Sequence, residues 1–172
     1  MAFMVQGTTT VAFADYYDVT EKDQRVFETN EGLTAEIVED ALIQATNRIL
    51  SDIRSTHWWK ELYNNLGDQS EIIDSYNARL VPAPQASLVK DRQQDFTDMT
   101  VYFALSEYLY PKVADFGNPD SAEVAKIAFF GERFRELFNK LIEAGDWYDF
   151  SGDGTIQKTE KAPSRVNLKR VR

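Results

Sequence analysis

The sequence contains no cysteine, and its only histidine is His57. The absence of cysteine excludes disulfide bonds, thiol nucleophiles and thiolate metal sites. A single histidine excludes a metal site built from several histidines of one chain. No window approaches the run of about 20 apolar residues that a membrane-spanning helix needs, so we expect no membrane partner. The first residues lack a basic region followed by a long apolar core, so we expect no signal peptide.

Sequence motifs of the common enzyme classes are also missing. There is no phosphate-binding P-loop, no dinucleotide fingerprint and no G-x-S-x-G nucleophile motif. Nothing in the sequence implies a nucleophile beside His57, which therefore receives no catalytic role. We expect that the protein is not an enzyme and has no catalytic residue.

The charge of the chain is unevenly distributed. The formal net charge is −9, but residues 158–172 hold six basic residues and one acidic residue and so carry +5. The preceding 157 residues therefore carry −14. An acidic body repels nucleic acid rather than gripping it. A basic tail can bind an acidic protein surface, such as the body of a neighbouring copy.

Apolar residues recur at helical spacing in three long segments. They predict helices over residues 34–57, 90–110 and 121–144, with shorter helices over 20–27 and 57–66. With 43% hydrophobic residues the chain can bury a core. We therefore predict an all-α fold, a helical bundle of three long helices plus short helices. Ile49, Phe103 and Phe134 are predicted to be buried in that core, and Trp58 and Trp59 to close one end of it rather than to form an intersubunit contact.

The predicted helices divide the chain into four parts. We expect an extended N-terminal arm or an edge strand over 1–19, a helical bundle domain over 20–148, an Asp/Gly-rich loop over 149–160 and a basic C-terminal tail over 161–172. Prolines mark an irregular segment over 67–88 inside the bundle domain. Gly131 stands inside the third long helix, where glycine costs roughly 1 kcal/mol relative to alanine. A close helix crossing at that point would explain it.

The loop over 149–160 fits the twelve-residue EF-hand calcium pattern. Asp149, Ser151 and Asp153 occupy positions 1, 3 and 5, Gly154 position 6 and Glu160 position 12, with Thr155 as a further candidate ligand. Calcium is therefore a possible cofactor. The alternative is a glycine-rich turn that joins the bundle to the tail, because Gly145 ends the preceding helix and Pro163 opposes a following one.

The tail alternates apolar and basic residues with a period of two. Such a segment suits an extended strand that adds to the sheet edge of another protein. The candidate docking residues are Arg165, Val166, Leu168, Lys169, Arg170, Val171 and Arg172. The competing hypothesis is a nucleic-acid-binding tail, but the interleaved valines and leucine favour protein docking.

Two short motifs resemble a known family. An acidic turn precedes the segment 41–49, of the form A-L-x-x-A-T-x-x-I, and a proline-marked linker leads to the segment 98–105, of the form D-x-x-x-Y-x-x-L. Together they resemble the head–tail adaptor, or head-completion, proteins of tailed bacteriophages over roughly residues 20–145. Their packing motifs are of low specificity, and the Trp58–Trp59 segment and the 149–160 loop are not features we associate with the family.

The resemblance implies a structural virion protein at the neck of the particle. It implies a homo-oligomeric ring of about twelve copies that docks under the portal protein and meets tail or neck proteins. DNA would pass through the ring lumen without sequence-specific binding, and the C-terminal tail would dock on the portal or on a neighbouring subunit. The alternative is a stand-alone helical calcium-binding or regulatory protein with a single EF-hand-like loop.

Overall fold

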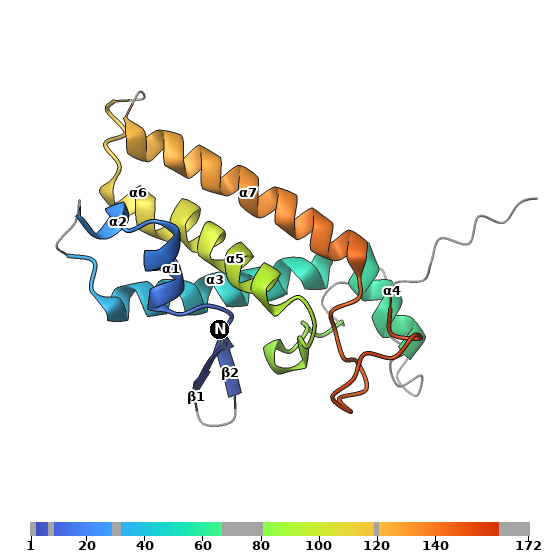
Figure 1. The fold of residues 1–172 in the computed structure, drawn as a ribbon. Coiled ribbons are helices and arrows are strands. Elements are labelled where there is room, and N and C mark those ends of the chain that lie inside the picture. The colour runs from blue at the N-terminus through green and yellow to red at the C-terminus, as the bar shows by residue number, and fades with distance from the viewer. Residues whose placement is uncertain (1–2, 7–8, 29–31, 67–80, 119–120, 162–172) are drawn as a thin grey trace, which may run out of the picture.

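The computed structural model describes residues 3–6, 9–28, 32–66, 81–118 and 121–161. The chain is mostly helical, as the sequence predicts. Helix α5 (Gln93–Ala104) lies between α3 (Ala35–Ser55) and α7 (Ala122–Ala144), so that these helices form successive layers (Figure 1). None of the described helices is both long enough and apolar enough to cross a membrane.

The shorter elements surround these layers. They are β1 (Met4–Gln6), β2 (Thr9–Ala12), α1 (Tyr16–Lys22), α2 (Arg25–Glu28), α4 (His57–Leu66), a 3₁₀-helix (Ala86–Leu88), a π-helix (Leu105–Leu109) and α6 (Tyr110–Val113). Figure 1 shows α4 and the segment after α7 together at one end, and α2 and α6 at the other. The predicted irregular segment 67–88 is described only from residue 81 onward.

The ends of α3 and α7 are set by capping residues that are visible in the sequence. The Thr34 hydroxyl accepts a hydrogen bond from the Ile37 amide at 3.4 Å, and the Ser121 hydroxyl accepts one from Val124 at 3.3 Å. Each bond satisfies one of the free amides of a first helical turn. Gly145 ends α7 in the left-handed conformation, with φ +54°, and its amide bonds to the Leu141 carbonyl.

The N-terminal segment contains strands, one of the two forms expected from the sequence, and also a helix that begins before residue 20. Strands β1 and β2 form an antiparallel hairpin in which Val5 faces Thr10, and α1 then begins at Tyr16 rather than at residue 20. Asp15 caps α1. Its carboxylate accepts a hydrogen bond from the Asp18 amide, and its own amide donates to the Asp18 carboxylate, so the two residues form a capping box. The sequence analysis missed this start because it placed the first short helix over residues 20–27.

The end of β2 is fixed between two helices. Phe13 is fully buried, its amide donates to the Thr46 hydroxyl of α3, and its carbonyl accepts from the Thr97 hydroxyl of α5 at 2.7 Å. Both threonine side chains are themselves buried. The hairpin therefore joins the core and is not an independent arm.

The second long helix is interrupted. The predicted continuous helix over 90–110 is divided into α5, the π-helix and α6, and it starts only at Gln93. Pro111 lacks an amide hydrogen, and in a regular helix its ring would crowd the carbonyl of Glu107. The wider π-helical turn directly before Pro111 relieves this conflict.

The core consists of two hydrophobic clusters. The first gathers around α1, the first half of α3, and the π-helix, and includes Val19, Val26, Val38, Leu42, Val101, Leu105, Leu109 and Phe130. The second gathers near α4, and includes Phe13, Ile49, Ile53, Trp59, Phe96, Met99, Leu141, Trp147 and Tyr148. Both clusters draw residues from distant parts of the chain, so neither can form from one helix pair alone.

The predicted core residues are only partly confirmed. Ile49 is fully buried, and Trp59 is also buried as predicted. Phe103 and Phe134 are half-buried, with their ring centroids 4.7 Å apart. They lie along the contact between α5 and α7 and pack against the second cluster without being fully buried.

Gly131 is not required by the packing inside the chain. A Cβ atom added at Gly131 would meet only the Ser106 Cβ, at 3.9 Å, which is an ordinary van der Waals distance. Its φ is helical, so an alanine would fit the backbone as well. The close crossing that would explain this glycine is therefore not found among the described residues.

Replacing Gly131 with alanine should stabilise the fold. We expect the free energy of unfolding to rise by about 1 kcal/mol, because alanine loses less backbone entropy in a helix than glycine does. Urea denaturation of Gly131→Ala and of the parent protein measures the change. Ala128→Gly, at an exposed position of the same helix, should shift stability in the opposite direction. A loss of stability in Gly131→Ala would contradict the ordinary van der Waals distance to Ser106 described here.

Candidate functional site

The Asp/Gly-rich loop begins at an extended segment rather than at the end of a helix. Directly before it, Tyr148 forms a β-bridge with Val89, the Asp149 amide donates to the Leu88 carbonyl at 2.9 Å, and the Lys90 amide donates to the Trp147 carbonyl at 3.0 Å. In a helix–loop–helix calcium site these residues would belong to the incoming helix. The structure instead gives this loop an extended base.

Aromatic side chains hold that base in the second cluster. Trp147 is fully buried, and its ring centroid lies 4.8 Å from those of both Trp58 and Phe96. Its indole N–H donates to the Leu141 carbonyl at 2.8 Å, so the polar atom of this buried ring is satisfied. The start of the loop is consequently placed by contacts with α4, α5 and α7 together.

Asp149 organises the first half of the loop. Its side chain is fully buried and accepts hydrogen bonds from the Ser151 hydroxyl and the Gly152 amide on one oxygen, and from the Gly154 amide on the other. Gly152 and Gly154 adopt φ of +72° and +92°, values that side-chain-bearing residues rarely adopt. The glycines thereby let the chain wrap around one carboxylate.

Glu160 closes the loop from its far end. The two oxygens of this buried carboxylate accept from the Ser151 amide at 2.6 Å and from the Gln157 amide at 2.8 Å. Asp153 is exposed and accepts from the amide and hydroxyl of Thr155 and from the Gln157 side chain. The Gln157 hydrogen bond, followed by those from Thr155, lowers the pKa of Asp153. The loop therefore satisfies its carboxylates with its own donors.

Calcium binding remains a prediction for this loop. Calcium takes six to eight oxygen ligands, and the loop offers side-chain oxygens of Asp149, Ser151, Asp153 and Glu160 and an oxygen of Thr155. Within the ranges that the structure describes, no group of three or more acidic or histidine side chains gathers where a metal ion could bind. Ligation would require the carboxylates to exchange their present hydrogen bonds for the ion. The arrangement as it stands matches the alternative, a glycine-rich turn.

Replacing Glu160 tests which of these roles the loop has. Without calcium, Glu160→Ala should lower the free energy of unfolding by about 1–3 kcal/mol, because two amides lose a charged acceptor. Thermal melts in the presence of a chelator, and again with millimolar calcium, measure this. If calcium is a ligand, it should raise the melting temperature of the parent by linkage, and Asp149→Ala should abolish that rise. A Glu160→Ala variant that is unchanged in chelator would contradict the turn.

The predicted docking residues of the tail lie outside the described residues. This applies to all seven, Arg165, Val166, Leu168, Lys169, Arg170, Val171 and Arg172. Lys161 is the last residue described. Docking through the tail therefore stays a prediction.

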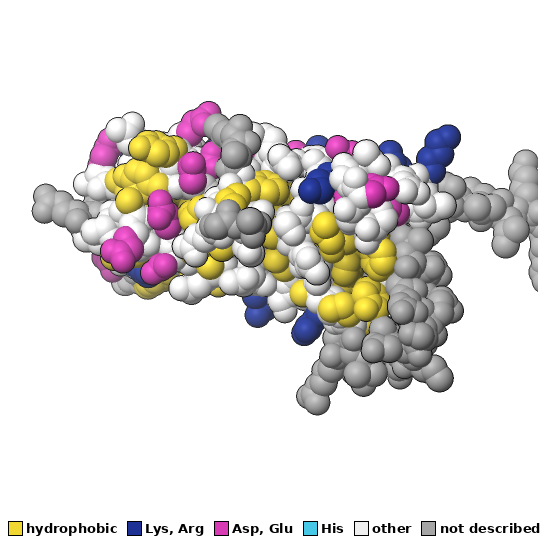
Figure 2. Space-filling model, turned by 90° about the horizontal axis from the view of Figure 1, so that it is seen from below, with side chains coloured by type: hydrophobic (Ala, Val, Ile, Leu, Met, Phe, Trp, Pro, Cys, Tyr) yellow, Lys and Arg dark blue, Asp and Glu magenta, His cyan; other side chains and the backbone are white. Residues whose placement is uncertain are grey.

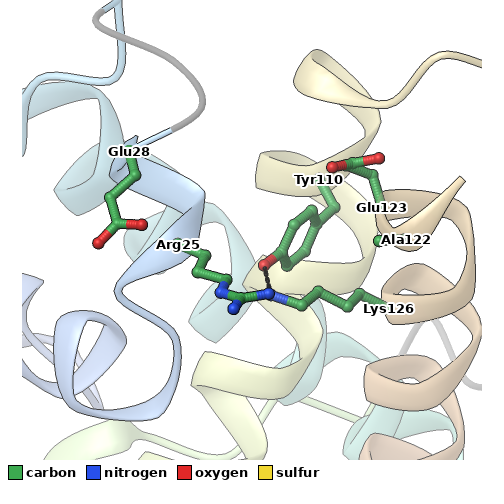
Figure 3. Close-up of a pocket in the computed structure, with 6 residues that line it drawn as sticks. All are labelled: Arg25, Glu28, Tyr110, Ala122, Glu123 and Lys126. Carbon is green, nitrogen blue, oxygen red and sulfur yellow. Dashed lines mark hydrogen bonds between the residues drawn. The ribbon is translucent and has the colours of Figure 1, made fainter.

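A pocket of about 320 Å³ opens at the other end of the molecule. It is lined by Arg25, Glu28, Tyr110, Ala122, Glu123 and Lys126, which come from α2, α6 and α7 (Figure 3). Two of these side chains are basic and two are acidic, so the lining does not select a ligand of one charge. Sequence analysis did not find this pocket, because residues of three separate elements form it and none belongs to a motif.

A hydrogen-bonded cluster forms one wall of the pocket. The Tyr110 hydroxyl donates to Asp23 at 2.6 Å, and Lys126 donates to the same carboxylate oxygen at 2.5 Å and to the Tyr110 hydroxyl at 2.7 Å. Burial alone would raise the pKa of Asp23, but the hydrogen bonds from Lys126 and Tyr110 lower it below its ordinary value. Burial and the bond to Asp23 raise the pKa of Tyr110. The cluster joins α1 to α6 and α7 and positions the pocket wall.

The Asp23 cluster should make stability depend on pH. Since the pKa of Asp23 is lower in the folded than in the unfolded protein, its contribution is present above the ordinary value of 3.8 and is lost as the pH falls through the folded pKa. We expect Asp23→Asn to be less stable at pH 7 by about 1–3 kcal/mol. The difference should shrink in acid, as urea denaturation at pH 7 and at pH 3 would measure. Asp40→Asn, at an exposed position of α3, controls for the loss of one charge, and a difference independent of pH would contradict the assignment.

Comparisons of this chain with models of protein families, with curated proteins and with solved structures find no match.

Proposed function

We propose that this chain is a structural head–tail adaptor of a tailed bacteriophage. In this role it forms a homo-oligomeric ring of about twelve copies at the neck of the virion, between the portal protein and the tail or neck proteins. DNA passes through the lumen without sequence-specific contacts. The chain contributes shape and contacts to the particle, and no residue has a catalytic role.

Packing of the two sequence motifs supports the proposal. Ala41, Leu42, Ala45 and Ile49 of the first motif are buried on α3. Met99, Val101 and Ala104 in the second are buried on α5, which contacts α3. We further propose that the adaptor's bundle consists of three long helical segments, namely α3, α5–α6 and α7. The motif residues would then form the centre of that body.

The distribution of charge is the observation that carries the proposal. Residues 1–157 carry a net charge of −14 and residues 158–172 a net charge of +5, so each copy offers both an acidic body and a basic segment. Opposite charges on two regions of identical subunits favour contacts that repeat from one copy to the next. An acidic body also suits a lumen through which DNA passes, because acidic side chains form no ion pairs with the DNA phosphates.

Deleting residues 161–172 tests the proposal. So short a segment buries little apolar surface of its own, so the melting temperature of the isolated protein should remain nearly unchanged after the deletion. Incorporation into particles should be lost, because the portal or the neighbouring copy loses its docking segment. Quantitative electrophoresis of purified particles from cells that produce the truncated protein measures incorporation.

Two matched variants separate charge from strand pairing in the tail. One replaces Arg165, Lys169, Arg170 and Arg172 with serine, and the other replaces Val166, Leu168 and Val171 with serine. Loss of incorporation only in the first would indicate electrostatic docking, and loss in both would indicate a docked strand. Normal incorporation of the truncated protein would overturn docking through the tail.

A second candidate function is a stand-alone calcium-binding regulator. It draws support from the loop backbone, because Gly154 at the sixth position has φ +92°, as the sharp turn of an EF-hand loop requires. Electron microscopy of the assembled particle distinguishes the two functions. The adaptor must appear at the neck, whereas a regulator forms no ring.

A further inference from the structure

Half of the negative charge of the body lies in one short segment. Residues 15–40 hold nine acidic and two basic residues and therefore carry −7. The other 131 residues of the range 1–157 together carry the remaining −7. Residues 15–40 form α1, α2 and the start of α3. Figure 2 shows acidic side chains around a hydrophobic area at the end of the molecule where α2 lies. Negative charge is thus concentrated at this end.

Only part of this charge is used inside the chain. Asp15 and Asp18 form the capping box of α1. Asp23 accepts hydrogen bonds from Lys126 and Tyr110. Four further carboxylates are exposed and form no hydrogen bond or ion pair within the part of the chain that the structure describes. They belong to Glu21, Glu28, Glu36 and Asp40. These four side chains are therefore available to a partner.

An exposed aromatic side chain accompanies the carboxylates. Tyr17 is 77% exposed, and its ring centroid lies 5.8 Å from that of Tyr16, which in turn lies 5.0 Å from Phe27 of α2. Glu21 follows Tyr17 by four residues and so lies on the same side of α1. Such a surface suits a partner with both basic and apolar side chains. We define the acidic end as Tyr17, Glu21, Glu28, Glu36 and Asp40.

The C-terminal tail has the composition that the acidic end requires. Residues 161–172 hold five basic residues and no acidic residue, so they carry +5. Val166, Leu168 and Val171 are interleaved with the basic residues. The basic side chains can pair with the carboxylates of the acidic end, and the apolar ones can cover Tyr17. No other segment of the chain combines opposite charge with apolar residues in this way.

The position of the tail favours the acidic end of another copy. Figure 1 shows α7 running from the end near α6 to the end near α4, and its 23 residues span about 34 Å. The described chain ends at Lys161, beyond the C-terminal end of α7. The eleven residues that follow can span at most about 36–40 Å when fully extended. Within one copy, almost the whole tail would be consumed in reaching the acidic end, and few residues would remain to contact it.

We propose that residues 162–172 of one copy dock on the acidic end of the next copy. The inference rests on the proposed docking of the tail and names the surface that receives it. The tail leaves from one end of a copy and binds at the opposite end of its neighbour, so the contact is head-to-tail. A head-to-tail contact generates a ring when the rotation from copy to copy closes.

Photo-cross-linking of the full chain locates the surface that the tail contacts. Since the chain has no cysteine, Asn167→Cys can carry a benzophenone maleimide at one defined place in the tail. This protein is mixed with ¹⁵N-labelled parent protein, irradiated, digested and analysed by mass spectrometry. We expect cross-links from the probe to residues 15–40 of the labelled copy. Cross-links confined to the probe's own copy, cross-links to other regions of the labelled copy, or none at all would overturn the inference.

Reciprocal charge reversal tests the contact energetically. Glu21→Lys with Glu28→Lys should weaken self-association at least about tenfold in sedimentation velocity, because two attractive pairs become repulsive. Arg165→Glu with Lys169→Glu should weaken it similarly. The four substitutions combined in one chain should restore association, which a variant that merely fails to fold cannot do.

A matched control separates the contact from the general effect of charge. Glu132→Lys with Glu143→Lys makes the same change of charge at exposed positions of α7, and should leave self-association as strong as that of the parent. Circular dichroism shows whether each variant is folded. An acidic-end variant that associates like the parent, or a fourfold variant without restored association, would contradict the assignment.

Incorporation into particles distinguishes this inference from the adaptor function. If the acidic-end variant enters particles normally while the tail deletion is excluded, the tail docks on another protein. The inference then fails and the adaptor function stands. If the fourfold variant regains association but the parent protein never enters particles, the inference stands and the adaptor function fails.

Discussion

The contact between residues 88–92 and 146–149 is the constraint on which much of the structure depends. Arg92 donates two hydrogen bonds to Asp146, at 2.5 and 3.0 Å, and the hydrogen bonds from Arg92 keep the pKa of Asp146 low. Arg92 adopts φ +56°, the single positive φ among the described non-glycine residues, directly before α5. A strained residue persists where its surroundings fix it. The same contact therefore sets where α5 starts and where the loop leaves α7.

Trp147 extends this constraint into the core. Its buried ring contacts Trp58 of α4 and Phe96 of α5, so segments far apart in the sequence meet at the end of the molecule near α4. Viewed from below, Figure 2 shows hydrophobic side chains still exposed at this end. The figure also shows acidic side chains around a second hydrophobic area at the end where α2 lies. On this face, acidic side chains therefore surround the hydrophobic area at the α2 end.

The loop and α7 differ in how completely the chain itself surrounds their side chains. In the loop, Asp149 and Glu160 find donors among the amides of their own segment, so the carboxylates are stable without any ligand. On α7, Phe138 and Ile142 pack against the second cluster but stay partly exposed, and Phe129 is half-exposed. Buried polar groups must be satisfied for the chain to fold, whereas exposed apolar area can await a partner.

The sequence by itself determined the mainly helical fold, the end of α7 at Gly145 and the burial of Ile49, because periodicity and helix-ending residues are local properties. It also located the Asp/Gly-rich loop. Only tertiary structure decided that the loop would have an extended base, that β1 and β2 would join the core, and that the helix after Gln93 would break into a π-helix. The Asp23–Tyr110–Lys126 cluster likewise joins residues up to 103 positions apart. Such contacts depend on which surfaces meet after folding, and no local pattern encodes them.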